Sequence, residues 1–257
     1  MNLQIAFPEK TEAERKEISK KFYRNLTDSF IEMIKMLSWS EKEIRKRFSG
    51  NMEVLNRWAG KDKGIQVVSG HFFNWEIANL SVSSHAEMPF LGVYMPLTNK
   101  AMNKIFYDLR SRFGTILIPA TDFKNKVTPY FKKQAALILV ADQNPGVPDS
   151  GWWLYFFSKP APFIPGPARG AIARNTVIIY AEYYKIKRGY YKIHFEEVTQ
   201  TPGDFTEASL TYLLAKRVES SIKKRPDNYL WTHKRWKHQW NAKLTEKWAD
   251  QQEIAPQ

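Results

Sequence analysis

The sequence contains no cysteine among its 257 residues. This excludes disulfide bonds, thiolate metal ligands and a cysteine nucleophile, and it agrees with a reducing compartment. No apolar run approaches the roughly eighteen residues that a membrane-spanning helix needs. The opening MNLQIAFPEK also lacks the apolar region of a secretory signal. The chain as it stands is therefore expected to be soluble or to bind membranes peripherally.

The motifs of several common enzyme classes are also absent. The sequence has no Gly-X-Ser-X-Gly elbow, no Walker-type phosphate loop, no His-Glu-X-X-His and no calcium-binding loop. Of the five histidines, none stands at metal-ligand spacing from another, and His233 and His238 come nearest. We therefore expect no metal site and no bound cofactor.

Acidic residues are scarce relative to basic ones. Lys and Arg total 39 against 26 Asp and Glu, a net charge of +13 that favours an anionic partner such as nucleic acid, lipid or a phosphorylated substrate. In the ending Lys216–Lys243, nine basic residues oppose two acidic ones and alternate with Trp231, Trp236 and Trp240. This pattern is typical of an anionic lipid surface, although a large aromatic core is an alternative for the rings.

The first sixty residues are expected to be helical. Thr11 and Glu14 have the spacing of a capping box, and the apolar residues after them recur at helical intervals along one face. Ser40 and Glu43 repeat this spacing at the start of a second, strongly charged helix, which we expect to run to Trp58. The sequence thus predicts an N-terminal helical pair.

From Gly64 onward the pattern changes to short apolar runs separated by helical or loop-like segments. These candidate strands lie at 65–68, 116–118, 136–140, 177–180 and 190–198. They predict the α/β class, with a mixed, mostly parallel sheet flanked by helices. The segment 144–167 is rich in proline, glycine and aromatic residues, and we expect a long irregular loop with a functional role there.

Length and composition favour one domain. A chain of 257 residues with 43% hydrophobic content can bury one substantial core. We therefore treat 1–257 as a single domain, with a helical N-terminal part at 1–60, an α/β core at 61–243 that carries the chemistry, and a tail at 244–257.

The stretch GHFFNWE, from Gly70 to Glu76, places an imidazole and a carboxylate five positions apart where a strand gives way to a helix. Five helical steps turn through about 500°, so the two side chains meet only if His71 lies in the turn. Glu76 can then accept a hydrogen bond from one ring nitrogen and leave the other free to take a proton from a substrate hydroxyl. The alternative is a core histidine capped by a nearby acid.

Five sequence blocks together resemble one known family. HFFNWE resembles the His, four residues, acid signature of the glycerolipid acyltransferase superfamily, in the form found in lipid A late (lauroyl/myristoyl) acyltransferases. Four more segments resemble further blocks of that family and follow in the same order. They are VYMPLTNKAMNKIFYDLRSRFG, LILVADQNPG, WLYFFSKPAPFIPGPARGAIAR and RPDNYLWTHKRWK. The likeness covers about residues 1–240. Met95 departs from it, because the family often has a basic residue there.

The resemblance implies an O-acyltransferase in which His71 is the general base and Glu76 orients it. Thioester attack creates an oxyanion and the substrates carry phosphates, so guanidinium groups are expected near the site. The residues expected to bind substrate are Asn74, Asn99, Arg110, Arg112 and Asp142. The alternatives are a solvated helix face for the two arginines and a turn for Asp142.

By the same resemblance, the donor is a fatty acyl thioester of acyl carrier protein or coenzyme A, and the acceptor is a hydroxyl of a lipid A precursor. Another lipid, such as a phosphatidylinositol mannoside or an aminolipid, is the alternative acceptor. A basic nucleic-acid-binding protein is the alternative of another class. The expected location is the cytoplasmic face of the bacterial inner membrane, reached peripherally or through an N-terminal anchor missing from this chain. Oligomeric state stays open.

Overall fold

The computed structural model of the chain describes residues 2–131 and 133–250. Its α-helices are α1 (Asn2–Ala6), α2 (Glu12–Met36), α3 (Glu41–Arg47), α4 (Glu53–Asn56), α5 (Trp75–His85), α6 (Lys100–Ser111), α7 (Phe123–Phe131), α8 (Gly166–Arg174) and α9 (Glu207–Lys224). Its strands are β1 (Phe48–Gly50), β2 (Ile65–Ser69), β3 (Phe90–Tyr94), β4 (Thr115–Pro119), β5 (Ala136–Val140), β6 (Trp152–Phe156), β7 (Lys159–Phe163), β8 (Val177–Lys187) and β9 (Tyr190–Thr199).

The described residues form one seven-stranded sheet in the order β1-β9-β8-β2-β5-β3-β4, together with a separate hairpin of β6 and β7. Neighbouring strands of the large sheet are parallel except for β8 and β9. The central strand β2 is buried along its whole length, as expected for a strand covered on both faces. The predicted α/β class with a mostly parallel sheet is confirmed.

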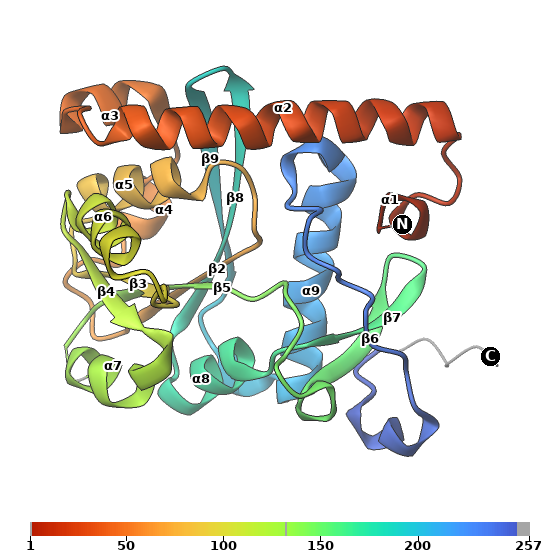
Figure 1. Cartoon of the computed structure of the whole chain (residues 1–257). Coiled ribbons are helices and arrows are strands. Elements are labelled where there is room, and N and C mark those ends of the chain that lie inside the picture. The colour runs from red at the N-terminus through yellow and green to blue at the C-terminus, as the bar shows by residue number, and fades with distance from the viewer. Residues whose placement is uncertain (1, 132, 251–257) are drawn as a thin grey trace.

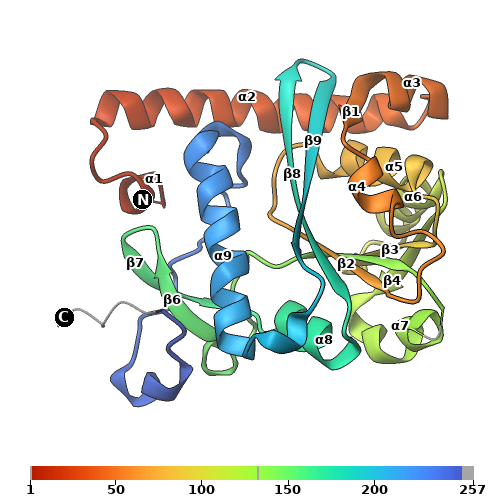
Figure 2. The same cartoon turned by 180° about the vertical axis from the view of Figure 1, so that it is seen from behind.

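Helices cover both faces of this sheet, and alternate side chains of β2 divide between them. Val68 and its neighbours pack against α8 and α9, and α7 packs on the same face further along. Val67 points to the opposite face, where α5 supplies Ile77 and Leu80 to the main core. Figures 1 and 2 show α2 lying across one end of the molecule, with α7 and α8 at the other.

The long helix α2 begins where the sequence predicts, directly after Thr11. Thr11 accepts a hydrogen bond from the Glu14 backbone, and the Glu14 carboxylate in turn binds the Thr11 backbone, which makes a complete capping box. Over the described residues, no helix is both long and apolar enough to cross a bilayer.

The predicted second helix is interrupted. After α3 the chain extends into β1, which pairs with β9, before the short α4. Gly50 lies so close to Ile193 that a Cβ at position 50 would stand 2.2 Å from the Ile193 carbonyl oxygen. Glycine therefore lets this edge strand pair closely, which the charge pattern of the segment did not indicate.

The predicted irregular loop at 144–167 is also wrong in its middle part, because this segment contains the β6–β7 hairpin. Several of its apolar side chains are core residues, and Trp153, Leu154 and Phe156 are fully buried. The hairpin is held by Arg235, which is buried and donates to the Pro162 carbonyl at 2.8 Å while its guanidinium stacks on Phe163.

The same packing corrects the expectation of a lipid-facing ending. Trp231 and Trp240 are buried, and Trp240 packs edge-on against Trp153 of the hairpin. The alternative of an aromatic core is thus the better description of these two rings.

In the predicted tail, residues up to 250 continue past a 3-10 turn at Ala242–Lys247, and 251–257 lie outside the described residues.

A buried carboxylate fastens α2 to the rest of the fold. Glu32 accepts hydrogen bonds from the Gly189 backbone at 2.8 Å, the Tyr191 hydroxyl at 2.6 Å and the Asn74 amide at 3.3 Å. These three partners belong to the β8–β9 turn, to β9 and to the start of α5. The contacts compensate the cost of burying a charge, and they join α2 to the segment that leads into α5.

We predict that Glu32→Ala lowers the free energy of unfolding by at least about 3 kcal/mol, because it leaves three inward-facing donors without an acceptor, at about 1–3 kcal/mol each. Urea unfolding monitored by circular dichroism measures this. Glu17→Ala is the matched control, since Glu17 lies on the same helix, is 51% exposed and has a 3.7 Å contact with Lys20. Equally small decreases in the free energy of unfolding for both variants would show that Glu32 does not anchor α2.

Candidate active site

The register of two parallel strands places His71 beside Asp142. Ser69 of β2 pairs with Val140 of β5, so the residues two positions further along each strand also lie side by side at the carboxyl edge of the sheet. His71 Nδ1 is 2.6 Å from Asp142 Oδ1, and the His71 backbone N–H donates to Asp142 Oδ2 at 3.2 Å. The two residues form a dyad whose geometry follows from strand pairing.

The turn that carries His71 is clamped by the C-terminal part of the chain. The Leu230 backbone N–H donates to the His71 carbonyl at 3.0 Å, and the Phe73 N–H donates to the Asn228 carbonyl at 3.0 Å. Phe72 lies between these contacts, fully buried and bridged to Tyr229. His71 therefore sits on a backbone that is held from both sides.

The electrostatics of the dyad favour an ionised Asp142 beside the His71 ring. Burial opposes charge on both groups, but attraction to the His71 ring lowers the pKa of Asp142 below its ordinary value. Burial likewise opposes protonation of the imidazole, yet the charge and hydrogen bond of Asp142 raise the pKa of His71 above its ordinary value. An ionised carboxylate can only accept, so Nδ1 carries the proton and Nε2 is left for a substrate.

Glu76, the predicted partner of His71, pairs with Arg110 instead. The Arg110 guanidinium contacts the Glu76 carboxylate through Nη2 at 2.5 Å and Nε at 2.9 Å, and Trp75 Nε1 donates to the same carboxylate at 3.0 Å. Glu76 starts α5 and points across to the last turn of α6. The direction of the helix thus turns the Glu76 side chain away from His71.

The remaining predicted site residues separate into two groups. Arg110 and Asp142 lie with His71 at the site. Asn74 and Asn99 cap α5 and α6, where their side chains accept from the backbones of Glu76 and Met102. Arg112 donates to the carbonyls of Met36 and Leu37 and so joins α6 to the end of α2. These last three residues have structural partners rather than a place beside the dyad.

A mostly apolar groove of about 780 Å³ opens at the dyad. Its volume lies in the range of sites that bind small molecules. His71, Glu76 and Arg110 supply polar groups at its mouth. The apolar lining includes Val93, Phe106, Leu117, Phe123, Ile138 and Leu139.

The groove reaches both faces of the sheet because two strands separate. The pairing of β3 with β5 stops at Gly92 and Ile138, whereas β2 stays paired with β5, and β3 with β4, for two more residues. One arm then lies on the face of α5 and α6, beside Ala78 and Leu117. The other arm lies on the face of α7 and α8, beside Leu139, and continues to Arg174.

Sequence reasoning missed several residues of this groove. Arg174 at the end of α8 and Tyr183 of β8 both line it, and Tyr183 donates to the Gly70 carbonyl at 3.3 Å beneath the turn. The equal spacing of His71 and Asp142 beyond their strands was a usable signal for the dyad. Arg174 gave no local signal, since it ends an ordinary amphipathic helix.

A fixed imidazole at the mouth of an apolar groove is typical of enzymes that activate a hydroxyl beside a hydrophobic substrate. A family model described as bacterial lipid A biosynthesis acyltransferase matches residues 1–238. The chain therefore belongs to that family, which confirms the family to which its motifs pointed.

The chain is also similar to curated relatives and to a solved structure. The lipid A biosynthesis palmitoleoyltransferase of Escherichia coli strain K12 is 24% identical over 243 residues, which cover 92% of this chain and 76% of that protein. The lauroyltransferase of the same organism is 23% identical over 241 residues, covering 92% and 77%. The 1-acyl-sn-glycerophosphate acyltransferase of Thermotoga maritima aligns with a TM-score of 0.40 and 12% identity over 80% of this chain and 95% of that one.

We predict that Asp142→Asn lowers the pKa of His71, because the change removes the anionic partner while burial, which disfavours the imidazolium, remains. Titration of the His71 ring by NMR measures the shift. Glu76→Gln is the control and should leave the pKa of His71 close to that of the unaltered protein. A larger fall in Glu76→Gln than in Asp142→Asn would instead support the pairing expected from the sequence.

Proposed function

We propose that this chain is an O-acyltransferase that moves a fatty acyl group from a thioester to a hydroxyl of a lipid A precursor. The observation that carries the proposal is the dyad of His71 and Asp142, with Nε2 free at the mouth of an apolar groove. The names of the relatives support the choice of acceptor. The donor we propose is acyl carrier protein or coenzyme A carrying the fatty acid.

In the proposed mechanism, His71 Nε2 takes the proton of the acceptor hydroxyl as its oxygen attacks the thioester carbonyl. The tetrahedral intermediate carries an oxyanion, and its collapse breaks the carbon–sulfur bond. The departing thiolate then takes the proton from the imidazolium. Asp142 holds the ring in one tautomer and stabilises its charged form. The thioester is a co-substrate, and the reaction needs no further cofactor.

Arg110 has a separate role in this proposal. Glu76 engages its Nε and Nη2 and so fixes the planar guanidinium beside the groove. Nη1 has no hydrogen bond to any described residue, and we assign it to a substrate phosphate or the oxyanion. Glu76 is therefore a positioning residue for Arg110. This role replaces the one expected for Glu76 beside His71. In the proposal, the acidic residue of the HFFNWE motif orients Arg110 instead of the histidine.

We predict that His71→Ala lowers turnover about 10²- to 10⁴-fold, which is the usual contribution of a general base. Asp142→Asn should also lower turnover, and the double variant should be little worse than His71→Ala, because the two residues act as one unit. Assays with purified protein, acyl thioester and lipid A precursor test this. Near-normal transfer by His71→Ala would refute the mechanism, and multiplicative losses would refute the dyad as a unit.

A set of exposed apolar side chains supports peripheral binding to the inner membrane at its cytoplasmic face. This apolar rim consists of Phe30, Ile31, Ile34 and Leu37 on α2 and Met95, Leu97, Met102 and Ile105 near the start of α6. Arg112 joins the end of α6 to the end of α2, and Met95 and Leu97 also line the groove. A bilayer in contact with the rim would deliver lipid substrates directly to the groove.

Exposed basic residues lie along α2, most of them before the rim residues in sequence. Exposed Lys16, Lys20, Lys21, Arg24 and Lys35 add an attraction to anionic lipid of about 1 kcal/mol for each residue near the surface. The rival of nucleic-acid binding finds less support, because Trp231 and Trp240 are buried and cannot stack on bases.

We predict that the protein co-sediments with anionic vesicles more than with neutral ones, and that added salt weakens the binding. The double variant Phe30→Glu/Ile34→Glu should reduce binding at least about tenfold, because each change brings a carboxylate to the interface. Val147→Glu is the control, since Val147 is equally exposed but lies outside the rim. Equal binding to both vesicle types, or none to either, would refute this surface.

A further inference from the structure

Arg174 is an unusual residue in the wall of an apolar groove. It is half-buried, and no carboxylate of the described residues forms an ion pair with it; burial lowers its pKa below the ordinary value. Its Nε is buried and has no hydrogen-bond partner within the described part of the chain. A charge in such surroundings is costly, so its position calls for an explanation beyond stability.

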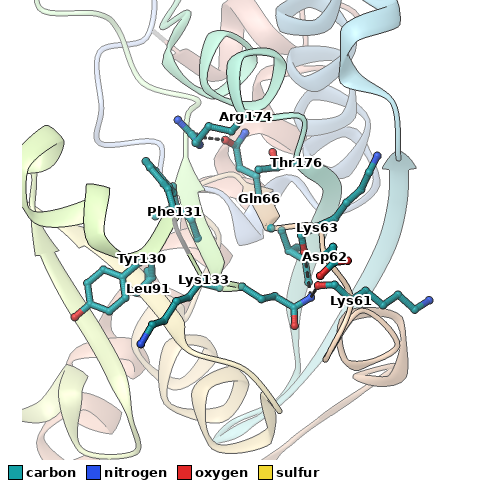
Figure 3. Close-up of a pocket in the computed structure, with 15 residues that line it drawn as sticks. Lys61, Asp62, Lys63, Gln66, Leu91, Tyr130, Phe131, Lys133, Arg174 and Thr176 are labelled. Atoms are coloured by element: carbon teal, nitrogen blue, oxygen red, sulfur yellow. Dashed lines mark hydrogen bonds between the residues drawn. The ribbon is translucent and has the colours of Figure 1, made fainter.

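The side chain is nevertheless held in one place. Nη2 donates to Gln66 Oε1 at 3.3 Å, and Gln66 is itself fixed by its 2.7 Å hydrogen bond to the Pro167 carbonyl. The guanidinium stacks on the Phe131 ring at 4.1 Å, as Figure 3 shows, and so spans from α8 to α7. It also lies against Gly170, where a Cβ would stand 2.6 Å from Nη2.

Two cavities meet at this side chain. On one side is the arm of the groove between α7 and α8, which runs down from His71. On the other is a smaller cleft of about 200 Å³ at the amino ends of the strands, also lined by Phe131 and Gln66 and shown in Figure 3. Because Arg174 lines both cavities, its guanidinium forms the partition between them.

We propose that Arg174, braced by Phe131 and Gln66, is the floor of the acyl-binding arm and limits the length of the fatty acyl chain transferred. This inference rests on the proposed acyltransferase function. The five residue steps from His71, just beyond β2, back to Gln66 within it span about 17 Å if extended, which suits a long-chain acyl group. The chain end then meets a cation that cannot move aside without losing its stacking contact.

The cleft beyond the partition can receive a longer chain once the partition is removed. Leu91 and Leu137 line it, and both point to the same face of the sheet as the groove arm. They belong to the apolar part of a lining that also contains Lys61, Lys63 and Lys133, and a longer chain would lie along them past position 174. Removing the guanidinium should therefore raise the permitted length, and it should not abolish binding of shorter chains.

The experiment gives the whole protein and its Arg174→Ala variant the lauroyl, myristoyl, palmitoyl and stearoyl thioesters of both coenzyme A and acyl carrier protein, with a lipid A precursor as acceptor. We expect Arg174→Ala to raise the ratio of kcat/KM for the longest donor over the shortest at least about tenfold, since one methylene in an apolar pocket is worth about 10- to 200-fold. The Kd of each donor, measured without acceptor by quenching of tryptophan fluorescence, should shift in the same direction.

Arg169→Ala is the matched control. Arg169 lies on the same helix but is exposed and pairs with Glu207 at 2.7 Å, so its removal should leave the length profile unchanged. If Arg174→Ala folds poorly, Phe131→Ala gives a second test, because it removes the ring that braces the guanidinium and should shift the profile in the same direction by a smaller factor.

The outcomes separate the two claims. If the unaltered protein transfers none of the four acyl groups, the proposed function fails, while the Kd series still tests the partition. The partition is refuted if transfer occurs and the dependence of kcat/KM and Kd on acyl length is the same in folded Arg174→Ala and Phe131→Ala as in the unaltered protein. A profile that shifts equally in Arg169→Ala would also refute it, because the effect would then belong to charge on α8 in general.

Discussion

The in-register, parallel pairing of β2 with β5 is the constraint on which the site depends. It brings the residues two positions beyond each strand together, so a histidine and an aspartate 71 positions apart in the sequence share a short hydrogen bond. Because the pair is anchored to buried central strands, its geometry does not rely on long flexible loops. The separation of β3 from β5 next to it then provides room for substrate without disturbing the dyad.

Much of this architecture could be predicted from local patterns. Capping residues at Thr11 and Ser40 set helix starts, and short apolar runs marked the strands of the central sheet. Two segments could not be predicted in this way. The strand β1 exists because Gly50 fits closely against β9, and the β6–β7 hairpin exists because its aromatic rings are buried by the C-terminal chain. Both depend on contacts with residues far away in the sequence.

The candidate site shows the same division. Motif position and the family resemblance drew attention to His71, Arg110 and Asp142, which the structure places together. Their partners could not be predicted, because partners depend on which strands and helices are neighbours. A spacing of five residues drew attention to Glu76, but the helix directs that carboxylate toward α6. Asn74, Asn99 and Arg112 show the converse: polar residues in a recognised block can serve helix ends and interhelical contacts instead.

The clamp on the His71 turn has a consequence for how the protein becomes active during synthesis. The backbone bonds that fix this turn come from Asn228 and Leu230, about 160 residues later in the chain. A nascent chain therefore cannot fix the turn at His71 until residues 228–230 have left the ribosome. An incomplete chain that ends before Asn228 would carry the whole HFFNWE motif but lack the two backbone hydrogen bonds that hold its histidine in place.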